Sequence, residues 1–143
     1  MSLDVLKEPP SPAEYRSLRG TAGWGEISDE IAQKALSSSS ISICVRKGSK
    51  LVGFGRVVGD GVLYFYIADV FVDPAQRGQG LGDLIISTII DRIREMAEPT
   101  ATVAVLAAPG RESFYEKFGF ERCPNKYFGD GMAFLEPIEN FPV

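Results

Sequence analysis

Apolar residues recur along the chain with two different periods, and these periods divide it into strands and helices. Alternation and β-branched runs are typical of strands, whereas apolar residues three and four positions apart are typical of amphipathic helices. Short turns with glycine separate the second, third and fourth predicted strands, so these three are expected to form an antiparallel meander. The pattern predicts strands at residues 3–7, 41–46, 51–58, 62–72, 102–106, 120–123 and 132–135.

The helices are predicted from apolar periodicity and from residues that are typical of helix ends. Ser11 and Ser28 have the sequence context of N-cap residues, and the helices that they begin extend to about residues 20 and 36. The longest amphipathic pattern follows a group of glycines near residue 80 and ends before Pro99. A short last helix is expected at residues 111–118.

Chain length and the order of these elements indicate the fold class. A chain of 143 residues is typical of one domain, and the four serines at residues 37–40 are too few for an interdomain linker. The run at residues 102–106 follows the longest helix and is expected to be a buried parallel strand. We therefore expect a single α+β domain over residues 1–143, with a mixed, mostly antiparallel sheet.

Composition and charge argue against several classes of protein. The chain is 45% apolar and 24% charged, as in soluble globular proteins, and no apolar run is long enough to span a membrane. The net charge is −4 and no basic cluster is present, which argues against nucleic-acid binding. The first residues lack the features of a signal peptide, so a cytoplasmic protein is expected.

The cysteine and histidine content narrows the chemistry further. Cys44 and Cys123 are the only cysteines, and both are expected to be free thiols in a reducing compartment. The chain has no histidine, so a structural zinc site is not expected and the commonest general base is missing. Any proton transfer must therefore use a carboxylate, a tyrosine, water or the backbone.

The most informative stretch lies where the apolar run at residues 62–72 stops. Asp73-Pro74 ends this run, and glycines at positions 78, 80 and 82 precede the longest helix. A strand, a glycine loop and a helix start together suit an anion, because uncovered backbone N–H groups converge on the positive end of the helix. The alternative interpretation is a glycine-rich turn without a ligand.

Two common phosphate-binding motifs do not fit this loop. A dinucleotide fingerprint needs a glycine at the sixth position counted from Gly78, where the chain has Asp83. An NTPase phosphate loop needs a lysine after its last glycine, and Asp83 occupies that place as well. The spacing that the chain does have is Arg77-x-x-Gly80-x-Gly82.

This spacing resembles the Gln/Arg-x-x-Gly-x-Gly/Ala signature of the GCN5-related N-acetyltransferase (GNAT) family. A second signature of that family, Tyr-x-x-x-Gly-Phe, is similar to the chain at Tyr115, Gly119 and Phe120. The resemblance covers roughly residues 51–135 and implies a sheet that is splayed at its central strand, with helices on both faces. Together with these signatures, Trp-Gly at residues 24–25, Asp-Val-x-Val-Asp-Pro at 69–74 and Gly-Met at 131–132 make the chain similar to the plant serotonin N-acetyltransferase branch of the family and its microbial relatives.

The resemblance implies acetyl-CoA as cosubstrate and assigns residues to it. The glycine loop would bind the pyrophosphate, and the backbone of the central strand would pair with the pantetheine arm. Ala108 stands where many members have an asparagine that contacts the coenzyme, so that contact does not carry over. The coenzyme-binding residues implied, without any metal, are Val70, Phe71, Val72, Arg77, Gly78, Gln79, Gly80, Leu81 and Gly82.

The reaction implied is direct attack of a primary amine on the thioester in a ternary complex. Tyr115 matches the acid tyrosine of the family and would protonate the departing thiolate, unless it is simply a core residue. Asp69 is a lone acid in an apolar strand, so it would take the amine proton through water or hold the cation. The alternative for Asp69 is a hydrogen-bonded structural acid on a solvent-facing side, and Glu26 is the other candidate base.

The expected acceptor is a small primary amine, and an arylalkylamine in particular. Trp24 would stack against it, unless this tryptophan is a core residue over the two early helices. A protein N-terminus or lysine as acceptor, and a non-catalytic acetyl-CoA-binding regulatory module, are the competing hypotheses. The family also implies a homodimer. The residues expected to line the acceptor site are Trp24, Glu26, Tyr64 and Tyr127.

Overall fold

Residues 2–142 are described in the computed structural model, and they form two compact units that divide between Val105 and Leu106. The first unit holds every described strand and the longer helices, and the second holds short helical turns. The prediction of a single domain concerns both units together and stays a prediction.

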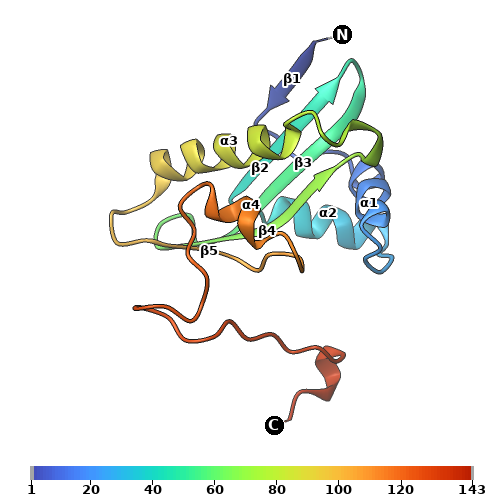
Figure 1. Ribbon diagram of the computed structural model, residues 1–143. Helices are drawn as coiled ribbons and strands as arrows, with labels where there is room; N and C mark the ends of the chain where they lie inside the picture. Colours follow the sequence, from blue (N-terminus) through green and yellow to red (C-terminus); the bar gives the residue numbers. More distant parts are fainter. Residues whose placement is uncertain (1, 143) are drawn as a thin grey trace. The chain divides into compact units, whose positions relative to one another are not determined.

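The first unit contains a five-stranded sheet (Figure 1). Its strands are β1 (Leu3–Leu6), β2 (Ile41–Lys47), β3 (Lys50–Gly59), β4 (Tyr64–Val72) and β5 (Thr102–Val105). They lie side by side in the order of the sequence. The pairs from β1–β2 to β3–β4 are antiparallel, and β5 is parallel to β4. The mixed, mostly antiparallel sheet that the sequence predicts is therefore confirmed.

The helices of the first unit are α1 (Pro12–Thr21), α2 (Asp29–Ser37) and α3 (Leu81–Met96), with the 3-10 turn η1 (Pro74–Gln76). These helices cover both faces of the sheet. Successive residues of β3 point to opposite faces, so neighbouring residues of this strand lie against different helices. Phe54 is buried in a cluster with side chains of α1 and α2. Gly53 and Gly55 lie under α3, where a Cβ at Gly53 would come within 2.9 Å of Ile85 and one at Gly55 within 2.5 Å. These two glycines let α3 pack closely on the strand.

Strand β4 has a neighbour on both sides along only part of its length. It pairs with β5 from Tyr64 to Ile67, and with β3 as far as Val72. A register shift between β3 and β4 leaves one extra residue on β4, Ala68. Residues 68–72 therefore have no partner among the described strands on the β5 side. This is the splay at the central strand that the family resemblance implies.

The strand predicted at residues 62–72 begins later, at Tyr64. Asp60 explains the difference, because its Oδ1 accepts the backbone amides of Val62, Leu63 and Tyr64 at 2.8, 2.7 and 3.0 Å. These hydrogen bonds hold the chain in a turn until the strand starts. The remaining strands of the first unit agree with the prediction to within one or two residues at each end.

The second unit has less regular structure than the sequence predicts. It contains α4 (Glu112–Glu116) and the 3-10 turn η2 (Ile138–Asn140), and no strand among its described residues. The strands predicted at residues 120–123 and 132–135 are therefore wrong, and the helix predicted at residues 111–118 is shorter.

Local contacts and the lack of a neighbouring strand explain these differences. Arg122 pairs with Glu116 of α4 at 2.9 Å, which ties residues 120–123 to the helix. Asn125 Oδ1 then accepts the amides of Tyr127 and Phe128 at 2.9 and 3.0 Å, so the chain turns. An apolar run is not stable as a strand without another strand beside it.

Candidate functional site

The start of α3 lacks the side-chain cap that α1 and α2 have. Gly80 is its N-cap residue, with a φ of 79°, and within residues 2–142 this helix start has no side-chain cap. Gly78 has a φ of 80°, and a Cβ added at either glycine would meet no heavy atom within 4 Å. The left-handed conformation favours glycine, and the first N–H groups of a helix have no partner within the helix. This geometry suits an anion.

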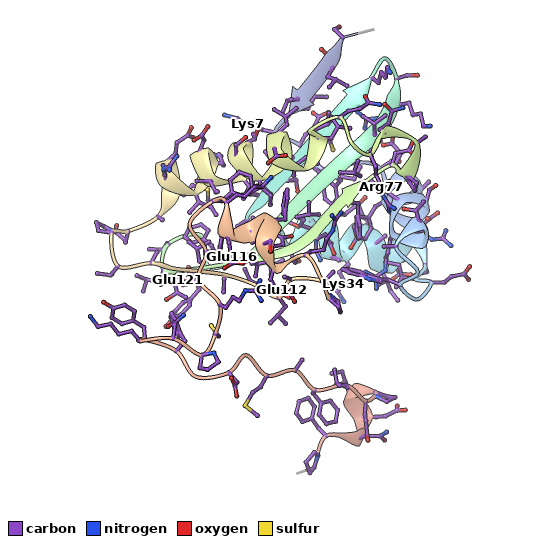
Figure 2. All side chains as sticks on the ribbon, in the orientation of Figure 1. Lys7, Lys34, Arg77, Glu112, Glu116 and Glu121 are labelled. Carbon is purple, nitrogen blue, oxygen red and sulfur yellow. The ribbon has the colours of Figure 1, made fainter. Side chains whose placement is uncertain are left out.

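The chain enters this loop through a fixed turn. Asp73 pairs with Lys50 at 2.9 Å and accepts the amide of Ala75 at 2.9 Å, and these contacts lower the pKa of its carboxyl. Arg77 follows in an extended conformation and is exposed at the loop (Figure 2). Gln76 Oε1 is buried and has no hydrogen-bond partner within residues 2–142. An acceptor beside the loop is thus left for a donor that the described protein does not supply.

The strand that leads into the loop provides an open backbone edge. Val70, Phe71 and Val72 pair with β3 on one side and lie on the part of β4 without a described strand on the other. The Phe71 side chain is buried in the core, so only its backbone is offered to a ligand. An extended group can add to such an edge as a further strand would.

Asp69, the residue before this edge, is buried, with 3% of its surface exposed. Tyr15 Oη donates to Asp69 Oδ2 at 2.7 Å, and Arg56 Nε donates to the same oxygen at 2.9 Å. Burial and the hydrogen bond to Asp69 raise the pKa of Tyr15, so the phenol remains a donor. The hydrogen bonds agree with the structural alternative for Asp69, whereas its burial does not agree with a solvent-facing position. Its role as a base stays a prediction.

Sequence reasoning did not single out Tyr15 or Arg56 as neighbours of the site. Arg56 Nη1 also donates to the backbone oxygen of Ala35, in the last turn of α2, at 3.2 Å. The available signal was a lone cation in one apolar strand and a lone acid in the next. The register of β3 and β4 places Arg56 directly opposite Asp69.

Trp24 and Glu26 line a cavity of about 300 Å³ formed by α1 and the loop that follows it. Trp24 is 45% exposed and its ring contacts Phe71, with centroids 5.2 Å apart, so it is not a buried core residue. Arg19 lies over the Trp24 ring at 5.4 Å and donates to the Gly25 carbonyl at 3.2 Å. The cavity thus combines an indole ring and a carboxylate with two arginines of α1.

The remaining predicted site residues are three tyrosines. Tyr64 is exposed at the start of β4, five residues before Asp69, which is about 16 Å along a strand. Tyr115 lies on α4 in the second unit, where its ring packs edge-on against Phe114 with centroids 5.1 Å apart. Tyr127 is exposed in the same unit. The roles assigned to these tyrosines stay predictions.

Residues 2–142 contain no group of three or more His, Cys, Asp or Glu side chains arranged to hold a metal ion. None of the helices in this part of the chain is long and apolar enough to cross a membrane. Cys44 is buried and Cys123 is exposed, and both are free thiols, as the sequence predicts.

Comparison with known proteins identifies the class that this fold and site define. The family described as "Acetyltransferase (GNAT) domain" matches residues 14–136. The chain therefore belongs to the GNAT family of N-acetyltransferases. The resemblance carried by the two sequence signatures is confirmed.

The relatives agree with this family and differ in how much is known of them. An uncharacterized N-acetyltransferase, ycf52, from Pyropia yezoensis is 35% identical over 116 residues, which cover 78% of this chain and 66% of the relative. Serotonin N-acetyltransferase 2, chloroplastic, from Oryza sativa subsp. japonica is 29% identical over 116 residues, which cover 78% and 56%. The chain thus spans about two thirds of the first relative and just over half of the second.

Solved structures show the same fold. A probable acetyltransferase of unknown function from meticillin-resistant Staphylococcus aureus superposes with a TM-score of 0.81 and is 28% identical, over 93% of this chain and 100% of that one. A GNAT family acetyltransferase from Streptococcus pneumoniae TIGR4 has a TM-score of 0.78 and 24% identity, over 94% of this chain and 98% of that one. The helix-flanked mixed sheet is therefore the fold of this family.

Proposed function

We propose that this protein transfers the acetyl group of acetyl-CoA to a small primary amine. The observation that carries the proposal is the uncapped glycine start of α3, directly after a strand whose backbone edge is open. These two features suit an anionic pyrophosphate and an extended pantetheine arm. The GNAT family, which generally uses acetyl-CoA, supports the same cosubstrate.

The chain's own backbone would provide most of the coenzyme site. Residues 78–82, which include Gln79 and Leu81, would donate N–H groups to the pyrophosphate, with the positive charge of Arg77 beside them. Residues 70–72 would pair with the pantetheine arm and polarise the thioester carbonyl through backbone N–H groups. The bound coenzyme supplies an acetyl group that is activated as a thioester.

Proton transfer is assigned to a carboxylate and a tyrosine, since the chain has no histidine. Alkylammonium groups titrate near a pKa of about 10, so the amine must lose a proton before it attacks. Asp69 is proposed to take that proton through water, with Glu26 as the alternative. As the amine nitrogen bonds to the carbonyl carbon and the C–S bond breaks, Tyr115 is proposed to donate its proton to sulfur, and the proton that the nitrogen then loses returns to the Tyr115 oxygen through water.

The cavity at Trp24 and Glu26 supports a small acceptor with an apolar body. Its volume of about 300 Å³ is in the range of small-molecule sites. Glu26 would attract the ammonium form of the acceptor, and the exposed Trp24 ring would cover its apolar part. The rice relative is named for serotonin, which supports an arylalkylamine as the first acceptor to test. A homodimer remains part of the proposal.

Thiol release from acetyl-CoA tests the proposed function. The acceptors are tryptamine, an aliphatic diamine, and a peptide with a free N-terminus and a lysine. We expect turnover with tryptamine, and a kcat about 100-fold lower in Tyr115→Phe, because general acid catalysis typically contributes that much. Acetylation of the peptide alone would overturn the small-amine acceptor. Coenzyme binding without thiol release in either protein would indicate a non-catalytic binding module.

A further inference from the structure

We infer that Tyr15 and Arg56 are positioning residues for acetyl transfer, and that they act through Asp69. Together these three residues hold the acceptor-binding loop, residues 22–28, in place against the open edge of β4. The inference rests on the proposed function for its kinetic part, and its spectroscopic part does not depend on turnover. We call the three residues the buried triad.

The buried triad lies at the point where β4 changes its pairing. Asp69 follows the extra residue Ala68 and sits opposite Arg56 on β3. Tyr15 and Arg56 donate to the same carboxylate oxygen, Oδ2, at 2.7 and 2.9 Å. A buried carboxylate and its cation contribute little net stability compared with apolar residues of the same volume, because both lose their water. A role in fixing geometry accounts for the triad better than stability alone.

The triad joins the sheet to both helices that flank the acceptor-binding loop. Tyr15 belongs to α1, and the Arg56 guanidinium donates to the carbonyl of Ala35 in α2 at 3.2 Å. The loop that connects these helices carries Trp24 and Glu26. The two helices that flank the loop are therefore each tied to the sheet, α1 to β4 through Tyr15 and Asp69, and α2 to β3 through Arg56.

Aromatic contacts carry the same connection to the cavity. The Tyr15 ring lies edge-on to Phe54, with centroids 5.7 Å apart, and 6.3 Å from the ring of Phe71. Trp24 packs edge-on against Phe71, with ring centroids 5.2 Å apart. A shift of Tyr15 away from Asp69 would therefore change how Trp24 sits on Phe71, and with it the distance between the acceptor and the backbone of β4.

A second ion pair ties α1 to the sheet and provides a matched control. Arg46 of β2 donates to Glu14 of α1 in a two-pronged contact, with distances of 2.6 and 2.9 Å. Glu14 lies next to Tyr15 on the same helix. Its partner Arg46 lies on β2, a strand that is not part of the acetyl-CoA edge. If the buried triad served only to attach α1, loss of the Arg46–Glu14 pair would have the same consequences.

The experiment compares Tyr15→Phe, which removes one hydroxyl and keeps the ring, with Arg46→Met. For Tyr15→Phe we expect kcat/KM for tryptamine to fall about tenfold, through a higher amine KM, with the acetyl-CoA KM within about twofold of wild type. For Arg46→Met we expect lower stability and both KM values within about twofold of wild type. All assays are run where each variant is fully folded.

Trp24 provides a readout that needs no turnover, because it is the only tryptophan in the chain. We expect acrylamide to quench Trp24 fluorescence more strongly in Tyr15→Phe than in wild type, and equally in Arg46→Met and wild type. Unchanged quenching and unchanged amine kcat/KM in Tyr15→Phe would overturn the inference, and so would equal changes in both variants. If wild type shows no turnover, the proposed function fails while the quenching comparison still decides the positioning role.

Arg56→Lys covers the case in which Tyr15→Phe does not fold. A lysine keeps the positive charge but has no planar fork, so it cannot reach both Asp69 and the Ala35 carbonyl. We expect Arg56→Lys to show the higher amine KM and the stronger Trp24 quenching. Wild-type values of both quantities in this variant would overturn the inference.

Discussion

Helices α1 and α3 begin in opposite ways. The start of α1 is closed by its own side chains, because Ser11 Oγ accepts the amide of Glu14 at 3.1 Å and Glu14 Oε1 accepts the amide of Ser11 at 3.0 Å. The start of α3 is open, because its N-cap residue Gly80 has no side chain that could accept a hydrogen bond. A closed helix start contributes to folding, whereas an open one retains donors for a ligand.

Helix α2 is closed in the same manner as α1. Ser28 Oγ accepts the amide of Ile31 at 3.2 Å, which satisfies one donor of its first turn. Among α1, α2 and α3, the open start is therefore confined to the helix that follows the edge of β4. Under the proposed function, α3 would serve the coenzyme, and α1 and α2 would support the acceptor side.

The largest expected effect comes from placing a negative charge at the open start. Asn and Asp both tolerate the left-handed conformation of Gly80, so Gly80→Asn serves as the uncharged control for Gly80→Asp. We expect Gly80→Asp to weaken acetyl-CoA binding about 100-fold, because it removes room and adds repulsion at an anion site, and Gly80→Asn to weaken it far less. Calorimetric titration measures both. Equal affinities of the two variants for acetyl-CoA would show that a negative charge at this position does not weaken binding.

The next largest effect is expected at the closed start of α1, where the contribution of Glu14 to stability depends on pH. The hydrogen bonds from Arg46, opposed in part by burial, lower the pKa of Glu14 from 4.5 to about 2. A folded-state pKa below the unfolded value means that this stability is present above about pH 5 and is lost as pH falls towards 2. With partial solvent screening, we expect a contribution of about 1–2 kcal/mol.

Urea unfolding of wild type and Arg46→Met at pH 7 and pH 3 measures this contribution. The wild type should be more stable than the variant by about 1–2 kcal/mol at pH 7, and this difference should shrink at pH 3 because Glu14 begins to bind a proton. A difference of the same size at both pH values would show that the pair does not set the pKa of Glu14.

A smaller effect is expected at Arg77, which is exposed beside the open start. We expect Arg77→Ala to weaken acetyl-CoA binding about tenfold at low salt and less at 0.5 M NaCl, because exposed charges are screened. Arg77→Lys keeps the charge and should lose less affinity than Arg77→Ala. A loss in Arg77→Ala that is independent of salt would mean that Arg77 holds the loop rather than contacting the pyrophosphate.

The smallest effect is expected at Ser11. Removal of a serine N-cap typically costs about 1 kcal/mol, so Ser11→Ala should lower the free energy of unfolding by that amount. The affinity for acetyl-CoA should not change, because the closed start takes no part in binding. Urea unfolding and calorimetric titration of the same protein provide both values. A weaker affinity in Ser11→Ala would contradict the division between closed and open helix starts.

The meander and the helix starts could be predicted because they depend on local sequence. Alternation identified β2, β3 and β4, and the serines before α1 and α2 marked both closed starts. The strands predicted in the second unit failed because a strand also needs a neighbour, and periodicity does not say whether one is present.

The same difference between local and distant contacts decides which parts of the candidate site could be predicted. Glycine spacing identified the loop at residues 78–82, since the left-handed conformation of Gly78 and Gly80 favours glycine. The contacts of Asp69 could not be predicted in the same way. Arg56 faces it through strand register, and Tyr15 reaches it through helix packing across 54 positions of the sequence.

The most direct test is a titration of the protein with coenzyme A, followed through the amide resonances of the backbone. We expect the amides of Gly78, Gly80 and Gly82 to shift and to saturate with the dissociation constant measured by calorimetry. The amides of Glu14 and Ile31, which are already hydrogen-bonded to Ser11 and Ser28, should stay in place. Saturation of the protein by coenzyme A without a change at the three glycines would contradict the central claim.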